Sequence, residues 1–228
     1  MRLSVVMATR NKAPYLARTL KSIVDQRPSF PFETIVVDDS STDETPEVCR
    51  QFGVRYHRID RPYTGNNGVP FNIGYRMAQG EIILTTSDEV VHRTPDLMEQ
   101  LVSRLTPTTF VAPLVYNVSR RGRRLAIFCG PHVVRPALFC TAIWRADLYA
   151  VGGHDEDFTN VGSNDTFLSD CLQRLPRTFV GCWDLVAWHY DHPKPLRGSQ
   201  KYLYWKRRKA EEGQHPWTAR TGTWEIPA

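Results

Sequence analysis

Two adjacent carboxylates, Asp88 and Glu89, follow an apolar run at residues 82–84. An apolar run that stops at charged residues is typical of a buried strand whose carboxyl end reaches the surface, where open α/β sheets bind ligands. Neighbouring carboxylates at such a place can hold a divalent cation, and the cation can hold a diphosphate. A solvated acidic turn is the simpler alternative, because short acidic motifs recur by chance.

Polar side chains also follow two earlier apolar runs, at residues 3–7 and 34–37. Thr9 comes shortly after the first run, and Asp39 comes after the second. The carboxyl ends of parallel strands share one edge of a sheet, so we expect both side chains to lie near Asp88. Separate structural roles, a helix cap at Thr9 and an Asx turn at Asp39, are the alternative. A single ligand site at this edge accounts for all three strand ends.

Strands and helices alternate in the first half of the sequence. Strands are predicted at residues 3–7, 34–37, 54–59 and 81–86, and helices at residues 14–26, 42–53 and 71–77. This alternation predicts an α/β fold, a Rossmann-like and mostly parallel central sheet with helices on both faces. Residues 54–59 alternate between apolar and polar, so this strand is expected near the edge of the sheet.

The second half has a less regular pattern. Helices are predicted at residues 95–105, 145–151 and 165–175, and strands at residues 110–116, 139–144, 179–182 and 186–188. Residues 117–140 show no clear period and are predicted to form a loop or lid. A length of 228 residues suits a single large domain that buries most of its apolar surface without cross-links.

Composition and charge limit the classes of protein to which this chain can belong. The formal net charge is +5, and no apolar run approaches the ~18 residues needed to span a bilayer. The five cysteines are scattered and form no CxxC pair, so reduced thiols in a cytoplasm fit better than zinc or disulfides. One basic cluster runs from Arg120 to Arg124, and another, interleaved with aromatic residues, from Lys201 to Lys209. These clusters are either solvated faces or surfaces for a polyanion, which can be DNA, an anionic membrane or an acidic glycan.

The motifs together resemble those of the family-2 glycosyltransferases, which have the glycosyltransferase A fold. The matching stretches are residues 4–11, 34–43, 72–74 and 80–83. Residues 87–89 stand where the family has its Asp-x-Asp motif, and residues 152–156 and 164–165 resemble its Gly-Gly-Phe-Asp-Glu and Glu-Asp motifs. Ser87 and Asn164 depart from the family pattern, and the first departure leaves metal binding to Asp88 and Glu89.

The resemblance implies a nucleoside-diphosphate sugar as the donor substrate. The residues implied to bind its nucleotide are Thr9, Arg10, Asp39, Asn72 and Asp88. A carboxylate can accept a hydrogen bond from the ring N–H of uracil, so Asp39 favours a UDP-sugar without excluding other donors.

The resemblance also implies a divalent cation, Mn²⁺ or Mg²⁺, held against the diphosphate. Its ligands would be Asp88, Glu89 and His189. The sequence does not fix which of the two acids is the principal ligand, and His192 rivals His189. For both histidines, a polar turn with no ligand role is the alternative.

Asp165 is implied to be the catalytic residue. It would act as a general base that takes the proton of the acceptor hydroxyl while the hydroxyl oxygen attacks the anomeric carbon. Family members with one such base typically invert the anomeric configuration. Asp155 and Glu156 would shape the acceptor pocket. A structural role for Asp165 as a helix N-cap is the alternative.

These roles divide the single domain. Residues 1–92 would form the nucleotide-sugar-binding half, residues 93–195 the acceptor-binding and catalytic half, and residues 196–228 a basic, aromatic helix and tail. The expected function is a metal-dependent, inverting glycosyltransferase acting on a glycan or a lipid-linked acceptor. Two alternatives stay open: the same chemistry on a hydroxylated base in DNA, such as 5-hydroxymethylpyrimidine, and a non-catalytic nucleotide or glycan binder with a decayed site. A nucleotidyltransferase is disfavoured, because residues 8–12 lack glycine.

Overall fold

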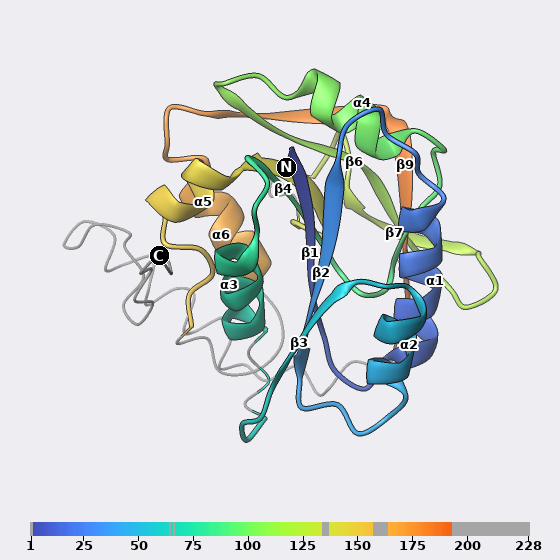
Figure 1. The fold of residues 1–228 in the computed structure, drawn as a ribbon. Coiled ribbons are helices and arrows are strands. Elements are labelled where there is room, and N and C mark those ends of the chain that lie inside the picture. The colour runs from blue at the N-terminus through green and yellow to red at the C-terminus, as the bar shows by residue number, and fades with distance from the viewer. Residues whose placement is uncertain (1, 64, 66, 134–136, 157–163, 193–228) are drawn as a thin grey trace.

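The computed structural model describes residues 2–63, 65, 67–133, 137–156 and 164–192 (Figure 1). Within these ranges nine strands form one sheet in the order β3-β2-β1-β4-β8-β6-β9-β5, and β7 pairs with β6. The basic residues from Lys201 to Lys209, and the whole tail predicted at 196–228, lie outside the described residues.

The first half is the predicted alternation of strands and helices around a parallel sheet. Its elements are β1 (Leu3–Thr9), α1 (Ala13–Val24), β2 (Phe32–Asp39), α2 (Thr45–Gln51), β3 (Arg55–Ile59), α3 (Gly68–Met77) and β4 (Ile82–Thr86). Strand β1 pairs in parallel with β2 and β4, and is buried along its whole length. Strand β3 lies at the edge and is largely exposed, as its alternating sequence predicts.

The second half adds antiparallel pairs to this sheet. Its elements are β5 (Val90–His92), α4 (Leu97–Arg104), β6 (Thr109–Val118), β7 (Arg124–Cys129), β8 (Cys140–Trp144), α5 (Arg145–Ala150), α6 (Asn164–Leu172) and β9 (Thr178–Tyr190). Strand β8 runs antiparallel to β4, β9 runs parallel to β6, and β5 runs antiparallel to β9.

Two predictions for this half were wrong, and one strand was missed. Residues 117–140 are not only a loop, because they contain β7, which is exposed along most of its length and therefore shows no alternation of apolar and polar residues. The strands predicted at 179–182 and 186–188 form the single strand β9, whose pairing with β6 shifts register between Pro113 and Leu114. The short strand β5 was not predicted, since its pairing with β9 decides it.

Helices cover both faces of the sheet, as the sequence predicts. Figure 1 shows α1 and α2 on one side of the β1–β2 region, and α3, α5 and α6 on the other. One buried cluster contains Leu16 and Leu20 of α1, and the second contains Tyr75 of α3 and Leu168 of α6. The sheet curls, so that β5 at its far end contacts α1, and the backbone N–H of His92 donates to Ser22 Oγ at 3.1 Å.

No helix among the described residues is long and apolar enough to cross a membrane. The five cysteines, all within the described ranges, are free and buried.

Two buried histidines make stability depend on pH. Burial lowers the pKa of His92 and of His154 to about 4, from an ordinary value of 6.5. The unfolded chain therefore binds protons on these rings at a higher pH than the folded chain does. Stability is expected to fall as the pH drops from about 6.5 towards about 4, by roughly 1–3 kcal/mol for each histidine.

Urea denaturation between about pH 7 and about pH 4.5 measures this loss. The variant His92→Leu is expected to reduce the pH dependence by about half, because His154 remains. His57→Asn, on the exposed strand β3, leaves the profile unchanged. A wild-type profile that is flat across this range would contradict the prediction.

Candidate active site

Thr9 and Asp88 lie in direct contact at the carboxyl edge of the parallel strands. The hydroxyl of Thr9, the last residue of β1, donates to Asp88 Oδ2 at 2.7 Å, and both side chains are buried. The backbone carbonyl of Asp88 accepts from Thr19 Oγ1 at 2.9 Å. Two of the strand ends predicted to converge therefore do so, because β1 and β4 are neighbours in the sheet.

The two acids at the end of β2, Asp38 and Asp39, have different partners. Asp38 Oδ2 accepts from the hydroxyl of Tyr56 at 2.6 Å, and its Oδ1 accepts from the backbone N–H of Ser41 at 2.8 Å. Asp38 therefore holds the turn after β2. Asp39 is paired with Arg61, whose Nε and Nη2 donate to the two carboxylate oxygens at 2.8 Å each. A planar two-point pair of this kind fixes the orientation of both groups.

Arg10 joins the same corner of the site. Its Nη1 donates to the backbone carbonyl of Asp39 at 2.7 Å, and its guanidinium lies 4.0 Å from the centre of the Tyr63 ring. Arg61 and Tyr63 both belong to the loop after β3 and were not identified from the sequence. The one signal for them was the position of that loop, which follows the third parallel strand.

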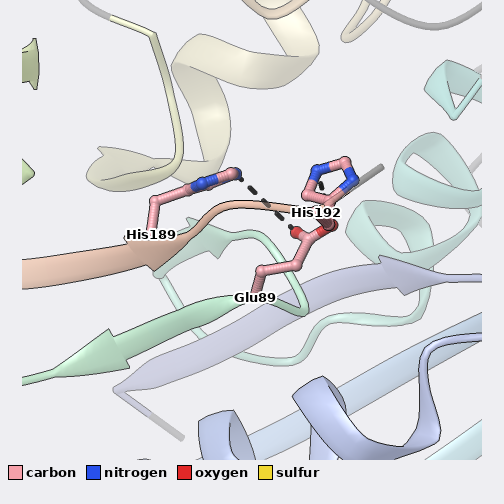
Figure 2. A group of neighbouring side chains, drawn as sticks. All are labelled: Glu89, His189 and His192. Carbon is pink, nitrogen blue, oxygen red and sulfur yellow. Dashed lines mark ion pairs between the residues drawn. The ribbon is translucent and has the colours of Figure 1, made fainter. Parts of the chain in front are cut away.

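Glu89 lies with two histidines, as Figure 2 shows. His192 Nε2 is 3.1 Å from Glu89 Oε1, and His189 Nε2 is 3.9 Å from Glu89 Oε2. Glu89 directly precedes β5, His189 is the register partner of Val90 on β9, and His192 follows the end of β9. The structure brings both candidate histidines to Glu89, whereas the sequence analysis treated them as alternative ligands.

This cluster has the chemistry of a metal site. One ligand atom from each of Glu89, His189 and His192 can be chosen so that all three lie within 4.8 Å of one another. Glu89 and His189 are buried and His192 is half-buried. His189 Nδ1 lies 3.3 Å from Asn117 Oδ1, a contact that orients the ring from behind. A carboxylate and two imidazoles fit a divalent transition-metal ion, which needs two or more further ligands from solvent or substrate.

Lys12 already places a positive charge on the two acids. Its Nζ forms an ion pair with Glu89 and lies 3.5 Å from Asp88 Oδ1. Lys12 immediately precedes α1 and was not identified from the sequence. A cation bound to Glu89 must therefore share this carboxylate with Lys12 or displace it.

Replacing Lys12 with methionine is expected to raise the affinity of the protein for Mn²⁺ about tenfold, because it removes a competing positive charge within 4 Å of the acids. Isothermal titration of Mn²⁺ at low ionic strength measures the change. The control Lys21→Met removes a lysine of α1 that is exposed and paired with Asp25, and should leave the affinity unaltered. Equal or weaker Mn²⁺ binding by Lys12→Met would show that Lys12 does not compete with metal.

Asn72 anchors the loop that carries Asp155 and Glu156. Its Nδ2 donates to the carbonyl of His154 at 2.9 Å and to Glu156 Oε1 at 2.8 Å. Its Oδ1 accepts from the backbone N–H of His154 at 2.8 Å. The loop begins at Gly152 and Gly153, whose φ angles of 75° and 67° favour glycine.

Asp165 is the second residue of α6, so the helix includes it rather than being capped by it. The side chain is half-buried, and loss of solvent raises the pKa of its carboxyl, partly offset by hydrogen bonds from backbone N–H groups. Asn164 Nδ2 donates to Asn67 Oδ1, and Asn67 is the residue before α3. The first turn of α6 therefore lies at the amino end of α3, on the edge that the loop after β3 also borders.

Two curated relatives share part of this sequence. The poly(ribitol-phosphate) beta-N-acetylglucosaminyltransferase TarS of Staphylococcus aureus is 32% identical over 98 residues, which are 41% of this chain and 17% of TarS. The beta-monoglucosyldiacylglycerol synthase of Nostoc is 23% identical over 235 residues, which cover 89% of this chain and 50% of that enzyme. This chain thus spans half or less of the length of these relatives.

Solved structures share the fold. The structure of residues 1–349 of S. aureus TarS with UDP-GlcNAc superimposes with a TM-score of 0.74 at 18% identity, covering 93% of this chain and 66% of that one. The mannosyltransferase PcManGT of Pyrobaculum calidifontis, solved with GDP-Man and Mn²⁺, gives 0.64 at 21% identity, covering 92% and 61%. The sequence profile described as glycosyl transferase family 2 matches residues 4–146, which is more than half of the chain. The strand ends at Thr9, Asp39 and Asp88 lie inside this match, and the chain belongs to glycosyl transferase family 2.

Proposed function

We propose that this protein transfers a sugar from a nucleoside-diphosphate donor to an acceptor hydroxyl, with the help of a divalent cation. The observation that carries the proposal is the cluster of Glu89, His189 and His192, at the same sheet edge as the contact between Thr9 and Asp88. Ser87 replaces an acid of the family motif, but two imidazoles supply further ligand atoms beside Glu89. This disfavours a decayed site that only binds nucleotide.

The donor nucleotide would bind along the ends of β1 and β2. Asp39 and Arg61 together offer a hydrogen-bond acceptor and donors, which suits the ring N–H and carbonyls of uracil, so we propose a UDP-sugar. Arg10 and Thr9 would line the same site. Asn72 is occupied by the loop at 154–156, so we propose that it acts on the nucleotide through that loop.

Glu89, His189 and His192 would hold the cation, with Asp88 beside them. Of the two cations proposed, Mn²⁺ suits imidazole ligands better than Mg²⁺, which prefers an all-oxygen octahedron. The cation, when bound, neutralises charge that develops on the departing diphosphate. Lys12, released from Glu89, would be free to contact the same phosphates.

Asp165 would take the proton from the acceptor hydroxyl while the hydroxyl oxygen attacks the anomeric carbon of the donor sugar. This attack inverts the anomeric configuration. Partial burial raises its pKa and so makes it a stronger base than an exposed aspartate. Asp155 and Glu156, held by Asn72, would shape the acceptor pocket.

The acceptor we propose is a glycan. The relatives' names point to phosphate-linked polyols for TarS and to a glycolipid for the Nostoc synthase. DNA with hydroxylated bases is a second candidate, favoured by the arginines from Arg120 to Arg124, because a base acceptor needs contacts to the phosphate backbone. All five thiols are free, which suits a cytoplasmic protein.

A thermal-shift panel of UDP, GDP and their sugars, with and without Mn²⁺, tests the donor and the cation together. A ligand at about a hundred times its dissociation constant adds ~2.7 kcal/mol to stability. UDP is expected to stabilise the protein only modestly alone and clearly with Mn²⁺, and UDP-sugar to be hydrolysed slowly when no acceptor is present. No stabilisation by any of these nucleotides would overturn the proposal.

A further inference from the structure

Three aromatic side chains lie on the outer face of β6 and β9. Tyr116 of β6 is the register partner of Trp188 of β9, so their side chains project from the same face. The rings of Trp188 and Tyr190 lie 6.5 Å apart, edge to face. His189, between them in sequence, points to the opposite face and to Glu89 (Figure 2). One strand thus carries the candidate metal ligand on one face and this aromatic surface on the other.

Arginines stack on each of these rings. The guanidinium of Arg93 lies 4.3 Å from the Trp188 ring centre, that of Arg124 lies 4.1 Å from Tyr116, and that of Arg18 lies 5.4 Å from Tyr190. Arg120 Nε donates to the hydroxyl of Tyr15 at 3.1 Å. We refer to Arg18, Arg93, Arg120 and Arg124 as the arginine row. All four are exposed and come from α1, the end of β5 and the β6–β7 hairpin.

The arginine row has no carboxylate partner within the part of the chain that the structure describes. Several other arginines do have acidic partners: Arg61 is paired with Asp39, Arg104 with Asp184 and Arg177 with Asp147. Uncompensated positive charges gathered on one face repel each other and attract a polyanion. Stacking on a ring fixes a guanidinium in place and leaves its N–H edge free to donate to phosphate. The arginine row is therefore suited to binding several anionic groups that follow one another along a bound chain.

The arginine row leads to the candidate metal cluster. Tyr15, which contacts Arg120, lies one turn along α1 from Lys12, and Lys12 is paired with Glu89. The hydroxyl of Tyr15 donates to the backbone carbonyl of Asp191 at 3.5 Å, next to His192. A chain lying along the arginine row would reach the reacting centre at this end.

We propose that the arginine row binds the acceptor, a polymer of polyol or sugar units joined by phosphodiesters, and guides one of its hydroxyls to the site. This inference rests on the proposed function. DNA fits less well, because each ring is half-buried and has an arginine on one face, which leaves little room for bases to stack. A membrane surface also fits less well, because binding to a membrane does not require the arginine row to lead to the candidate metal cluster.

Fluorescence anisotropy of a labelled synthetic ribitol-phosphate oligomer, titrated with the full chain at several salt concentrations, tests this inference. The double variant R93Q/R124Q is expected to weaken binding roughly tenfold and to reduce the slope of log Kd against log salt by about 0.7 for each arginine. The control R2Q/R50Q removes the same charge from the amino end of β1 and from α2, and is expected to change neither quantity.

Each other outcome overturns the inference. Equal binding by R93Q/R124Q and wild type, or equal weakening by both double variants, would show that the arginine row has no specific role. Tighter binding to DNA oligonucleotides or to phosphatidylglycerol vesicles, sensitive to the same two arginines, would assign the surface to that partner instead. Binding of UDP with Mn²⁺ to the wild type is measured separately, and its absence would count against the proposed function alone.

Discussion

Replacing Glu89 with glutamine is expected to lower sugar transfer by about a thousandfold, because the cation contributes several kcal/mol to the reaction. Glu89 contacts His189, His192 and Lys12. A neutral amide keeps the shape of the side chain but removes the charge that balances a cation. Titration of Mn²⁺, together with transfer rates at saturating donor, measures the loss.

The matched control is Glu81→Gln, because Glu81 is exposed at the opposite end of β4. It should bind Mn²⁺ as the wild type does. Undiminished Mn²⁺ affinity in Glu89→Gln would move the metal site away from the Glu89 cluster. The variants His189→Asn and His192→Asn then compare the contribution of each imidazole to Mn²⁺ affinity. Loss of either ligand is expected to weaken metal binding roughly 10–100-fold.

Replacing Asp165 with asparagine is expected to lower transfer by about 10²–10⁴-fold while donor binding is retained, because a general base contributes this much and does not contact the nucleotide. The carboxylate must be ionised to accept a proton, and its raised pKa places the acid limb of the pH–rate profile above the ordinary range for aspartate. In the variant this limb should disappear. Asp25→Asn, at an exposed position after α1, is the control.

The same substitution should make the protein more stable at neutral pH. Because the pKa of Asp165 is raised in the folded state, the folded chain binds this proton more tightly than the unfolded chain does, and ionisation costs stability as the pH rises through the folded pKa. The amide of the variant carries no charge, so the gain is present above that pKa and absent below the unfolded value of 3.8. A gain in melting temperature with loss of turnover is the expected pair of results. A variant that keeps full transfer would leave Asp165 a structural residue of α6.

The sequence by itself determined the first half of the fold and the sheet edge where the candidate site lies. Runs such as residues 3–7 and 34–37 are apolar throughout because both faces of a central parallel strand are buried. Parallel strands end at one edge, so the polar residues at the ends of β1 and β4 were bound to meet, and Thr9 does bond to Asp88. These conclusions follow from local pattern and one topological rule.

Only the tertiary structure decided which side chains lie together in the candidate site. Val90 pairs with His189 across an antiparallel contact between distant segments, and this register, which no local pattern encodes, brings both histidines to Glu89. Strand β7 was not predicted for the same reason, since its exposed residues carry no periodic signal. The basic cluster from Arg120 to Arg124 was visible in the sequence, but its position beside Arg18 and Arg93 depends on the pairing of β6 with β7 and β9. Local periodicity reports burial, whereas a site is assembled from contacts between segments that are far apart in the chain.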